Sequence, residues 1–105
     1  MKLLIVDDEY DKVQSMFDLA KEANLQVEIT HETSAASARS KMRQIKFDML
    51  VVDLNLPSQA GAKQNANGGL ELIELLYSDL KAHLPPSVVI LTAREDLASE
   101  ARSEA

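Results

Sequence analysis

The sequence has no cysteine, no long hydrophobic run and a minority of basic residues. Without cysteine, the chain can form neither disulfides nor thiolate metal sites, which fits a reducing compartment. The amino end, MKLLIVDDE, has one lysine and an apolar run that is too short for a signal-peptide core or a membrane helix. We therefore expect a cytoplasmic protein without a membrane segment.

The charge balance and the missing motifs exclude several functions. Eleven lysine and arginine residues stand against seventeen acidic residues, for a formal net charge of −6, so we expect no direct contact with nucleic acid. There is no Walker glycine loop, no GxSxG and no pair of histidines at metal-binding spacing. His31 and His83 stand singly at expected element ends and are predicted to be surface residues.

What the chain has is an alternation of strand-like and helix-like segments. Its 105 residues, 46% of them hydrophobic, suffice for one domain with one core. Short apolar runs predict strands, and apolar residues at spacings of three and four predict helices. The βαβαβαβα order predicts an α/β fold, a doubly wound parallel sheet with helices on both faces. The expected strands are residues 2–6, 25–30, 49–52 and 87–91, and the expected helices are residues 10–23, a helix capped by Thr33 or Ser34, residues 69–80, and a last stretch from Glu95 to Ala105.

The same periodicities predict the core. Strands 49–52 and 87–91 are apolar throughout, as in strands buried on both faces, whereas strand 25–30 alternates and is placed near a sheet edge. Arg39 and Arg43 are expected on a solvated helix face. The expected apolar helix faces consist of Val13, Met16, Phe17 and Ala20 in the first helix, Ala35, Ala38, Met42 and Ile45 in the second, and Leu70, Ile73, Leu76 and Leu80 in the third.

Polar side chains follow three strands of this expected sheet. Asp7 and Asp8 follow the first strand, Asp53 follows the third, and Thr92 follows the fourth. Because ligands of open α/β sheets bind at the carboxyl ends of the strands, we expect these side chains to form a site. A single aspartate in such a place would most often cap a helix or form a turn. That interpretation suits Asp7 or Asp8 alone, but it suits the whole set poorly.

The expected site is a cluster of three carboxylates, which repel one another unless a cation lies among them. Mg²⁺ suits such a cluster, because it prefers oxygen ligands and is commonly held by one or two carboxylates together with a phosphate. The chemistry indicated is phosphoryl transfer. An aspartate would act as the nucleophile, the metal would neutralise developing charge, and the Thr92 hydroxyl would hydrogen-bond a phosphoryl oxygen.

Three motifs at these positions resemble one family. VDDE at residues 6–9, DLNLP at residues 53–57 and LTA at residues 91–93 are similar, in order and spacing, to the receiver domain of bacterial two-component response regulators. The resemblance runs from Met1 to about Ser99. Each motif alone is weakly specific, but three in register are strongly so. The resemblance implies the flavodoxin-like receiver fold, with strand order 2-1-3-4 and the fifth strand missing.

The resemblance also implies roles for the site residues. Asp53 would accept a phosphoryl group from a histidine kinase or a phosphotransfer protein. Asp8, Asp53 and the backbone carbonyl of Asn55 would ligate Mg²⁺, while Asp7 would act largely through water. Thr92 would be the switch hydroxyl. We do not expect an enzyme, because such a domain shows at most weak self-phosphorylation and autodephosphorylation.

The chain departs from the family pattern after the acceptor. If Gly69 is aligned with the family glycine that starts the third helix, roughly eight residues within 58–68 are inserted. The insertion is either a tolerated surface loop, which we favour, or a lid beside Asp53.

A second departure is at the carboxyl end. The family's fifth strand, phosphoryl-binding lysine, switch aromatic and fifth helix cannot be assigned, and Lys81 precedes the fourth expected strand. We therefore assign no basic residue to the site. Residues 1–105 are expected to be a single receiver-like domain that is incomplete at the carboxyl end, either a fragment or a shortened receiver. The unprotected strand 87–91 predicts a homodimer or a swapped assembly.

Two other functions compete with the phosphoacceptor. A haloacid-dehalogenase-like phosphatase would need a second acid two residues after the nucleophile and a threonine beyond it, where this chain has Asn55 and Pro57. A receiver-like protein-interaction module that acts without phosphorylation is the stronger alternative. The missing lysine favours it, and the set of Asp7, Asp8 and Asp53 argues against it.

Overall fold

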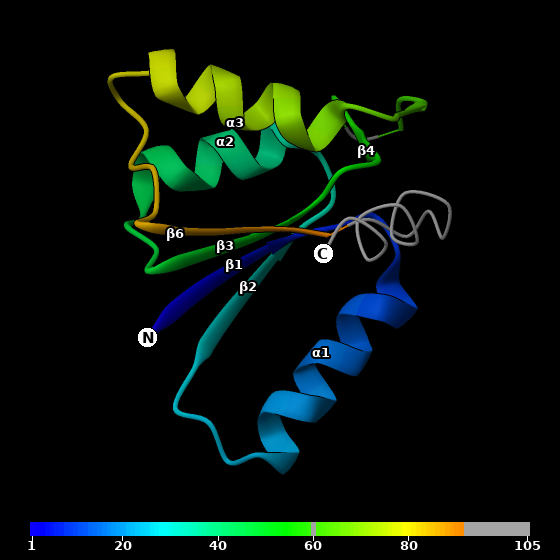
Figure 1. Ribbon diagram of the computed structural model, residues 1–105, viewed down its shortest axis with the longest axis vertical. Coiled ribbons are helices and arrows are strands. Elements are labelled where there is room, and N and C mark those ends of the chain that lie inside the picture. Colours follow the sequence, from blue (N-terminus) through cyan, green and yellow to red (C-terminus); the bar gives the residue numbers. More distant parts are fainter. Residues whose placement is uncertain (60, 92–105) are drawn as a thin grey trace, which may run out of the picture.

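The computed structural model describes residues 1–59 and 61–91, which form a sheet with helices on both faces (Figure 1). Thr92 and the expected last helix lie outside the described residues. In chain order, the elements are β1 (Lys2–Val6), α1 (Tyr10–Glu22), β2 (Glu28–Glu32), α2 (Ala35–Gln44), β3 (Met49–Asp53), β4 (Leu56–Pro57), β5 (Gln64–Asn65), α3 (Gly68–Ser78) and β6 (Ser87–Leu91).

The four long strands form one parallel sheet in the order β2-β1-β3-β6. This confirms the predicted doubly wound α/β fold and its strand order 2-1-3-4. In Figure 1, α2 and α3 lie above the sheet and α1 lies below it. β1 and β3 are central, whereas β2 and β6 each have one pairing partner in the described part of the chain. Among the described helices, none is long and apolar enough to cross a membrane.

The core lies between the sheet and the pair of helices α2 and α3. Leu4, Val6, Leu50 and Val52 are fully buried there, and they come from the two central strands. Burial of one such side chain contributes about 1.5–3 kcal/mol before the loss of chain entropy is subtracted. This face of the sheet is therefore the main source of stability.

α2 forms as its sequence predicts. The Ser34 side chain caps the helix by accepting the N–H of Ser37 at 3.2 Å. Ala38 and Met42 are fully buried on the predicted apolar face. The small alanine lets the helix approach the sheet closely, as the pattern of small residues indicates.

The end of α3 is tied to α2 by ion pairs. α3 ends at Ser78, earlier than predicted. The Nε atoms of Arg39 and Arg43 both lie 2.8 Å from Oδ2 of Asp79. Bonds to these two guanidinium groups hold the pKa of Asp79 well below its usual 3.8. Arg39 and Arg43 are 34% and 44% exposed, in keeping with the predicted solvated face, and they also connect α2 to the end of α3.

The buried face of α3 differs from the predicted one. Leu76 is buried as predicted, but Leu70 is 42% exposed and Leu80 is 99% exposed. Leu72, which was not in the predicted set, is fully buried. Gly69, Leu72 and Leu76 lie at spacings of three and four, like the residues of the predicted face. This face is the buried one because Gly69 packs closely on the sheet backbone.

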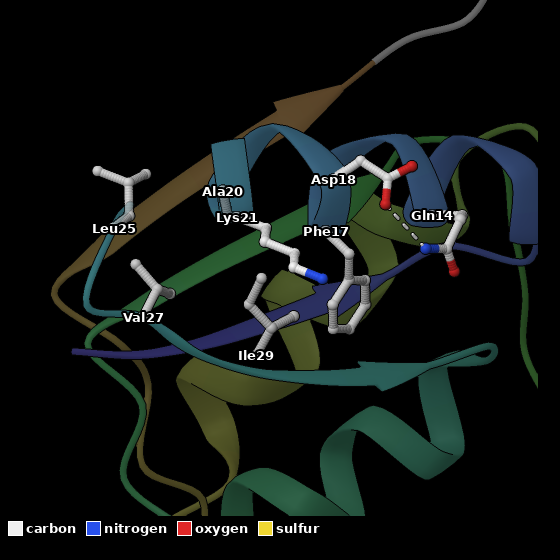
Figure 2. A pocket seen from close by; sticks show the side chains of 8 residues that line it. All are labelled: Gln14, Phe17, Asp18, Ala20, Lys21, Leu25, Val27 and Ile29. Carbon is white, nitrogen blue, oxygen red and sulfur yellow. Dashed lines mark hydrogen bonds between the residues drawn. The ribbon is translucent and has the colours of Figure 1, made fainter. Parts of the chain in front are cut away.

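α1 covers the other face of the sheet less completely. Val13 is buried as predicted, but Phe17 is 36% exposed, and Met49 and Val51 are only half-buried. Phe17 and Ile29 line a hollow of about 360 Å³ between α1 and β2 (Figure 2). The predictions of a core position for Phe17 and of full burial on both faces of β3 are therefore wrong on this side.

The segment after β3 contains secondary structure that was not predicted. β4 and β5 pair antiparallel, with Leu56 opposite Asn65 and Pro57 opposite Gln64. Leu56 is fully buried in the core. Gly61 has a φ of +82°, which glycine adopts without strain. The polar loop predicted here is instead anchored at its start by an apolar side chain and closed by a short ladder.

Candidate functional site

Asp7, Asp8 and Asp53 meet at the carboxyl-terminal edge of the sheet. β1 and β3 pair in parallel with Val6 opposite Val52, so the residues that follow these two lie side by side. One oxygen from each of the three carboxylates lies within 4.8 Å of the others. The fold thus brings together the three acids that sequence analysis selected.

Asp7 is fixed by contacts with its own turn and with β2. Its side chain is 1% exposed, its Oδ1 accepts the N–H of Glu9 at 2.9 Å, and its own N–H donates to the carbonyl of Glu32 at 3.0 Å. Nε2 of His31 lies 2.7 Å from the Asp7 carbonyl oxygen, and the Tyr10 ring packs edge-on against His31. The prediction of a surface histidine is therefore wrong, because His31 is half-buried and supports this turn.

Asp53 lies in a turn that is bonded to two other elements. It is 3% exposed, and its Oδ1 accepts the N–H of Asn55 at 3.3 Å. The Leu54 N–H donates to the carbonyl of Leu91 at 2.9 Å, and the Leu54 carbonyl accepts the N–H of Gly69 at 3.0 Å. The turn is thus held between β6 and α3. The carbonyl of Asn55 stays a predicted metal ligand, since this contact uses its N–H.

Gly69 sets the distance between α3 and the backbone of Asp53 and Leu54. A Cβ atom at this position would overlap the carbonyl oxygen of Asp53 and would lie 3.0 Å from Cα of Leu54. Because these are backbone atoms of a bonded turn, only glycine fits without a shift of the helix. This contact supports the alignment of Gly69 with the glycine that starts the third helix of the resembling family.

Lys12, on the first turn of α1, brings a positive charge into the site. Its Nζ lies 2.8 Å from Oδ2 of Asp7 and 3.6 Å from Oδ2 of Asp53, and its side chain is 25% exposed. No basic residue was predicted here. The signal in the sequence is weak: α1 begins at Tyr10, directly after the turn that carries Asp7, so its first turn passes close to the strand end.

Among the described residues, Lys12 pairs with two of the three carboxylates, those of Asp7 and Asp53. Burial raises the pKa of Asp53, the ammonium of Lys12 opposes this shift, and the charges of the other two aspartates add to it. Burial alone would lower the pKa of Lys12, but its bond to Asp7 and the charges of the surrounding carboxylates raise it above the usual 10.5. A cation beside these carboxylates favours their ionised form.

No protein-family model matches this sequence, but solved structures share its fold. A CheY-like response regulator receiver domain from Methylobacillus flagellatus has a TM-score of 0.66 at 22% identity, over 91% of this chain and 72% of that one. The response regulatory domain of mrkE from Klebsiella pneumoniae has a TM-score of 0.62 at 23% identity, over 98% and 75% of the two chains. The MaeR response regulator bound to beryllium trifluoride has a TM-score of 0.66 at 14% identity, over 100% and 79%. The chain has the CheY-like receiver fold.

A curated relative extends well beyond this receiver fold. The uncharacterized protein y4jS of Sinorhizobium fredii (strain NBRC 101917 / NGR234) is 34% identical over 94 residues, which are 89% of this chain and 23% of that protein. The chain thus spans less than a quarter of the relative's length.

The acidic edge of this receiver fold suits a divalent metal ion. Mg²⁺ binds oxygens at about 2.0–2.1 Å, so ligands on opposite sides of one ion are about 4.2 Å apart. One oxygen from each carboxylate lies within 4.8 Å of the others, so two of them can reach a common ion after a small shift, with the third acting through water. Oδ2 of Asp7 is buried, and Nζ of Lys12 lies 2.8 Å from it. The residues therefore fit Mg²⁺ if the lysine gives way.

Proposed function

We propose that this domain is a phosphoacceptor in a cytoplasmic two-component phosphorelay. Asp53 would receive the phosphoryl group from a histidine kinase or a phosphotransfer protein. The observation that carries this proposal is the cluster of Asp7, Asp8 and Asp53, in which Asp7 and Asp53 are buried, at the carboxyl-terminal edge of a receiver fold. Asp7 and Asp8 follow the central strand β1, and Asp53 is the last residue of the central strand β3, so the backbone of the sheet positions the cluster.

In the proposed reaction, one carboxylate oxygen of Asp53 attacks phosphorus. The bond between phosphorus and the donor atom breaks, the donor keeps the electron pair, and an acyl phosphate forms on Asp53. The N–H of Asn55 orients the carboxylate through Oδ1 at 3.3 Å, while Oδ2 faces Lys12. The domain is itself the substrate, so we propose no enzyme activity beyond weak self-phosphorylation and autodephosphorylation.

We assign Mg²⁺ to Asp8, Asp53 and the backbone carbonyl of Asn55, with Asp7 acting through water. When bound, the ion supplies positive charge beside the transferring phosphoryl oxygens. Burial raises the pKa of Asp53, and a cation beside the carboxylate would favour the ionised form that attacks. The phosphoryl contact of Thr92 is proposed from the sequence motif.

The test is the intact mass of the chain after incubation with Mg²⁺ and acetyl phosphate. Wild type should gain the mass of one phosphoryl group, and Asp53→Asn should gain none. Asp8→Ala should bind no Mg²⁺ in a titration. Asp18→Asn, on the exposed surface of α1, is the matched control and should behave as wild type. A gain that persists in Asp53→Asn would place the acceptor elsewhere, and unchanged Mg²⁺ binding by Asp8→Ala would show that the metal site is misassigned.

A second candidate is a protein-interaction module that has the receiver fold and acts without phosphorylation. Lys12 favours it by already placing a cation among the carboxylates. Val88, Val89 and Ile90 on β6 favour it too, since they are 37–44% exposed and apolar, as at a partner interface. Absence of any phosphoryl gain in wild type, under saturating donor and Mg²⁺, would support this function over the first.

A further inference from the structure

Lys12 faces the carboxylate oxygens that the backbone leaves available. In Asp7, Oδ1 accepts the N–H of Glu9, and Oδ2 lies 2.8 Å from Lys12 Nζ. In Asp53, Oδ1 accepts the N–H of Asn55, and Oδ2 lies 3.6 Å from the same Nζ. In both aspartates, one oxygen is thus oriented by the backbone, and the other is turned toward the ammonium.

The ammonium and a divalent cation would repel each other strongly in this space. Mg²⁺ bound to Oδ2 of Asp53 would lie less than about 6 Å from Nζ, given its usual distance to oxygen ligands. Little water screens such a pair, because Asp7 and Asp53 are 1% and 3% exposed. The lysine is the group that can move, since its side chain is 25% exposed and has a flexible four-carbon stem.

We propose that Lys12 is the resident counter-ion of the acidic site and that a divalent cation binds by displacing it. Lys12 is then a positioning residue with two effects. It stabilises the carboxylates of Asp7 and Asp53 when no metal is bound, and it lowers the affinity of the site for Mg²⁺. This inference rests on the proposed function for the existence of the metal site.

Calorimetric titration of the whole chain with Mg²⁺ tests this inference. Lys12→Met, which keeps the length of the side chain without its charge, should bind Mg²⁺ at least about fivefold more tightly than wild type, at the lower end of usual coupling between two ligands. Lys12→Arg keeps the charge and should stay near wild type. Lys21→Met, on the exposed last turn of the same helix, is the matched control and should change nothing.

Thermal unfolding gives a second readout that separates the counter-ion role from simple packing. Without Mg²⁺, Lys12→Met should unfold at a lower temperature than wild type, because Asp7 stays buried without its partner. Saturating Mg²⁺ should raise the midpoint of Lys12→Met more than that of wild type. If Lys12→Met does not fold, Lys12→Gln serves in both measurements with the same expectations.

The outcomes distinguish this inference from the proposed function. Equal or weaker Mg²⁺ binding by the neutral variants would overturn the inference. If wild type still gained a phosphoryl group on Asp53 in that case, the proposed function would stand. If neither wild type nor the Lys12 variants bound Mg²⁺, and no phosphoryl group were gained, both would be overturned.

Discussion

Gly69→Ala tests how the fold holds Asp53. The added methyl group would overlap the carbonyl oxygen of Asp53 and would lie 3.0 Å from Cα of Leu54. Both atoms belong to a turn that is hydrogen-bonded to β6 and α3, so neither can rotate away as a flexible side chain would. α3 must therefore move outward and take with it Leu72 and Leu76, which are buried in the core.

The magnitude follows from two opposing terms. Forcing extra atoms into a packed region costs typically about 1–3 kcal/mol, and the upper part of that range applies here because the overlap is with backbone atoms. Alanine recovers at most about 1 kcal/mol, because it has a higher helix propensity than glycine. We expect Gly69→Ala to be about 1–2 kcal/mol less stable than wild type, and each 1 kcal/mol lowers the unfolding temperature of a domain of this size by roughly 4–8 °C.

Urea unfolding followed by circular dichroism measures this difference. Glu74→Ala, on the exposed face of the same helix, is the control and should stay within about 0.5 kcal/mol of wild type. Since the overlap is with the backbone of Asp53, Gly69→Ala should also slow the phosphorylation of Asp53 by acetyl phosphate. A variant as stable as wild type, or more stable, would refute the reasoning, because α3 would then not press on the backbone of Asp53 and Leu54.

Two further predictions concern the ion pairs of α2 and the edge of the sheet. The pKa of Asp79 lies below 3.8 because two arginine side chains bond to its ionised form. These bonds therefore contribute stability that is present above pH 3.8 and is lost as the pH falls through the lower pKa of the folded state. Asp79→Asn should thus be less stable than wild type at about pH 7, by a difference that shrinks at about pH 3; urea midpoints at the two pH values measure this, and a constant difference would contradict it. Val89 is 41% exposed on β6, which has one strand partner in the described part of the sheet, so Val89→Lys should weaken self-association in sedimentation experiments at several concentrations. A wild-type chain that is monomeric at every concentration would contradict the argument from the exposed edge.

Three of the four long strands could be predicted to within one residue, because each is an unbroken apolar run bounded by polar residues. The second strand was predicted at residues 25–30 but lies at Glu28–Glu32. The alternation of apolar and polar residues begins at Leu25, but pairing with β1 begins only at Glu28, which lies opposite Lys2. The bounds of an edge strand depend on its neighbour, and local composition does not contain that information.

The part of the candidate site that could be predicted is the part that follows from the order of the strands and the residues at their ends. Asp7, Asp8 and Asp53 directly follow apolar runs, so parallel pairing of those runs is enough to bring them together. Lys12 could not be placed in the same way, because the direction of a side chain on the first turn of a helix depends on how the helix lies on the sheet. The buried face of α3 could not be predicted for a similar reason. Two sets of residues in this helix have the spacing of a buried face, and the contact of Gly69 with the strand backbone decides which set is buried.

Asp53 is coupled to the two helix layers in different ways. α3 reaches it through the backbone, because Gly69 packs on the Asp53 carbonyl and bonds to Leu54, with the buried Leu72 behind it. α1 contacts it through the Nζ of Lys12, a side chain that can move away. The sheet face under α1 is also less tightly packed, with hollows of about 360 and 480 Å³. Exchange of the ammonium for a metal ion therefore requires no repacking of the core. A covalent change that moves the Asp53 backbone does require it, so such a change would be transmitted to α3.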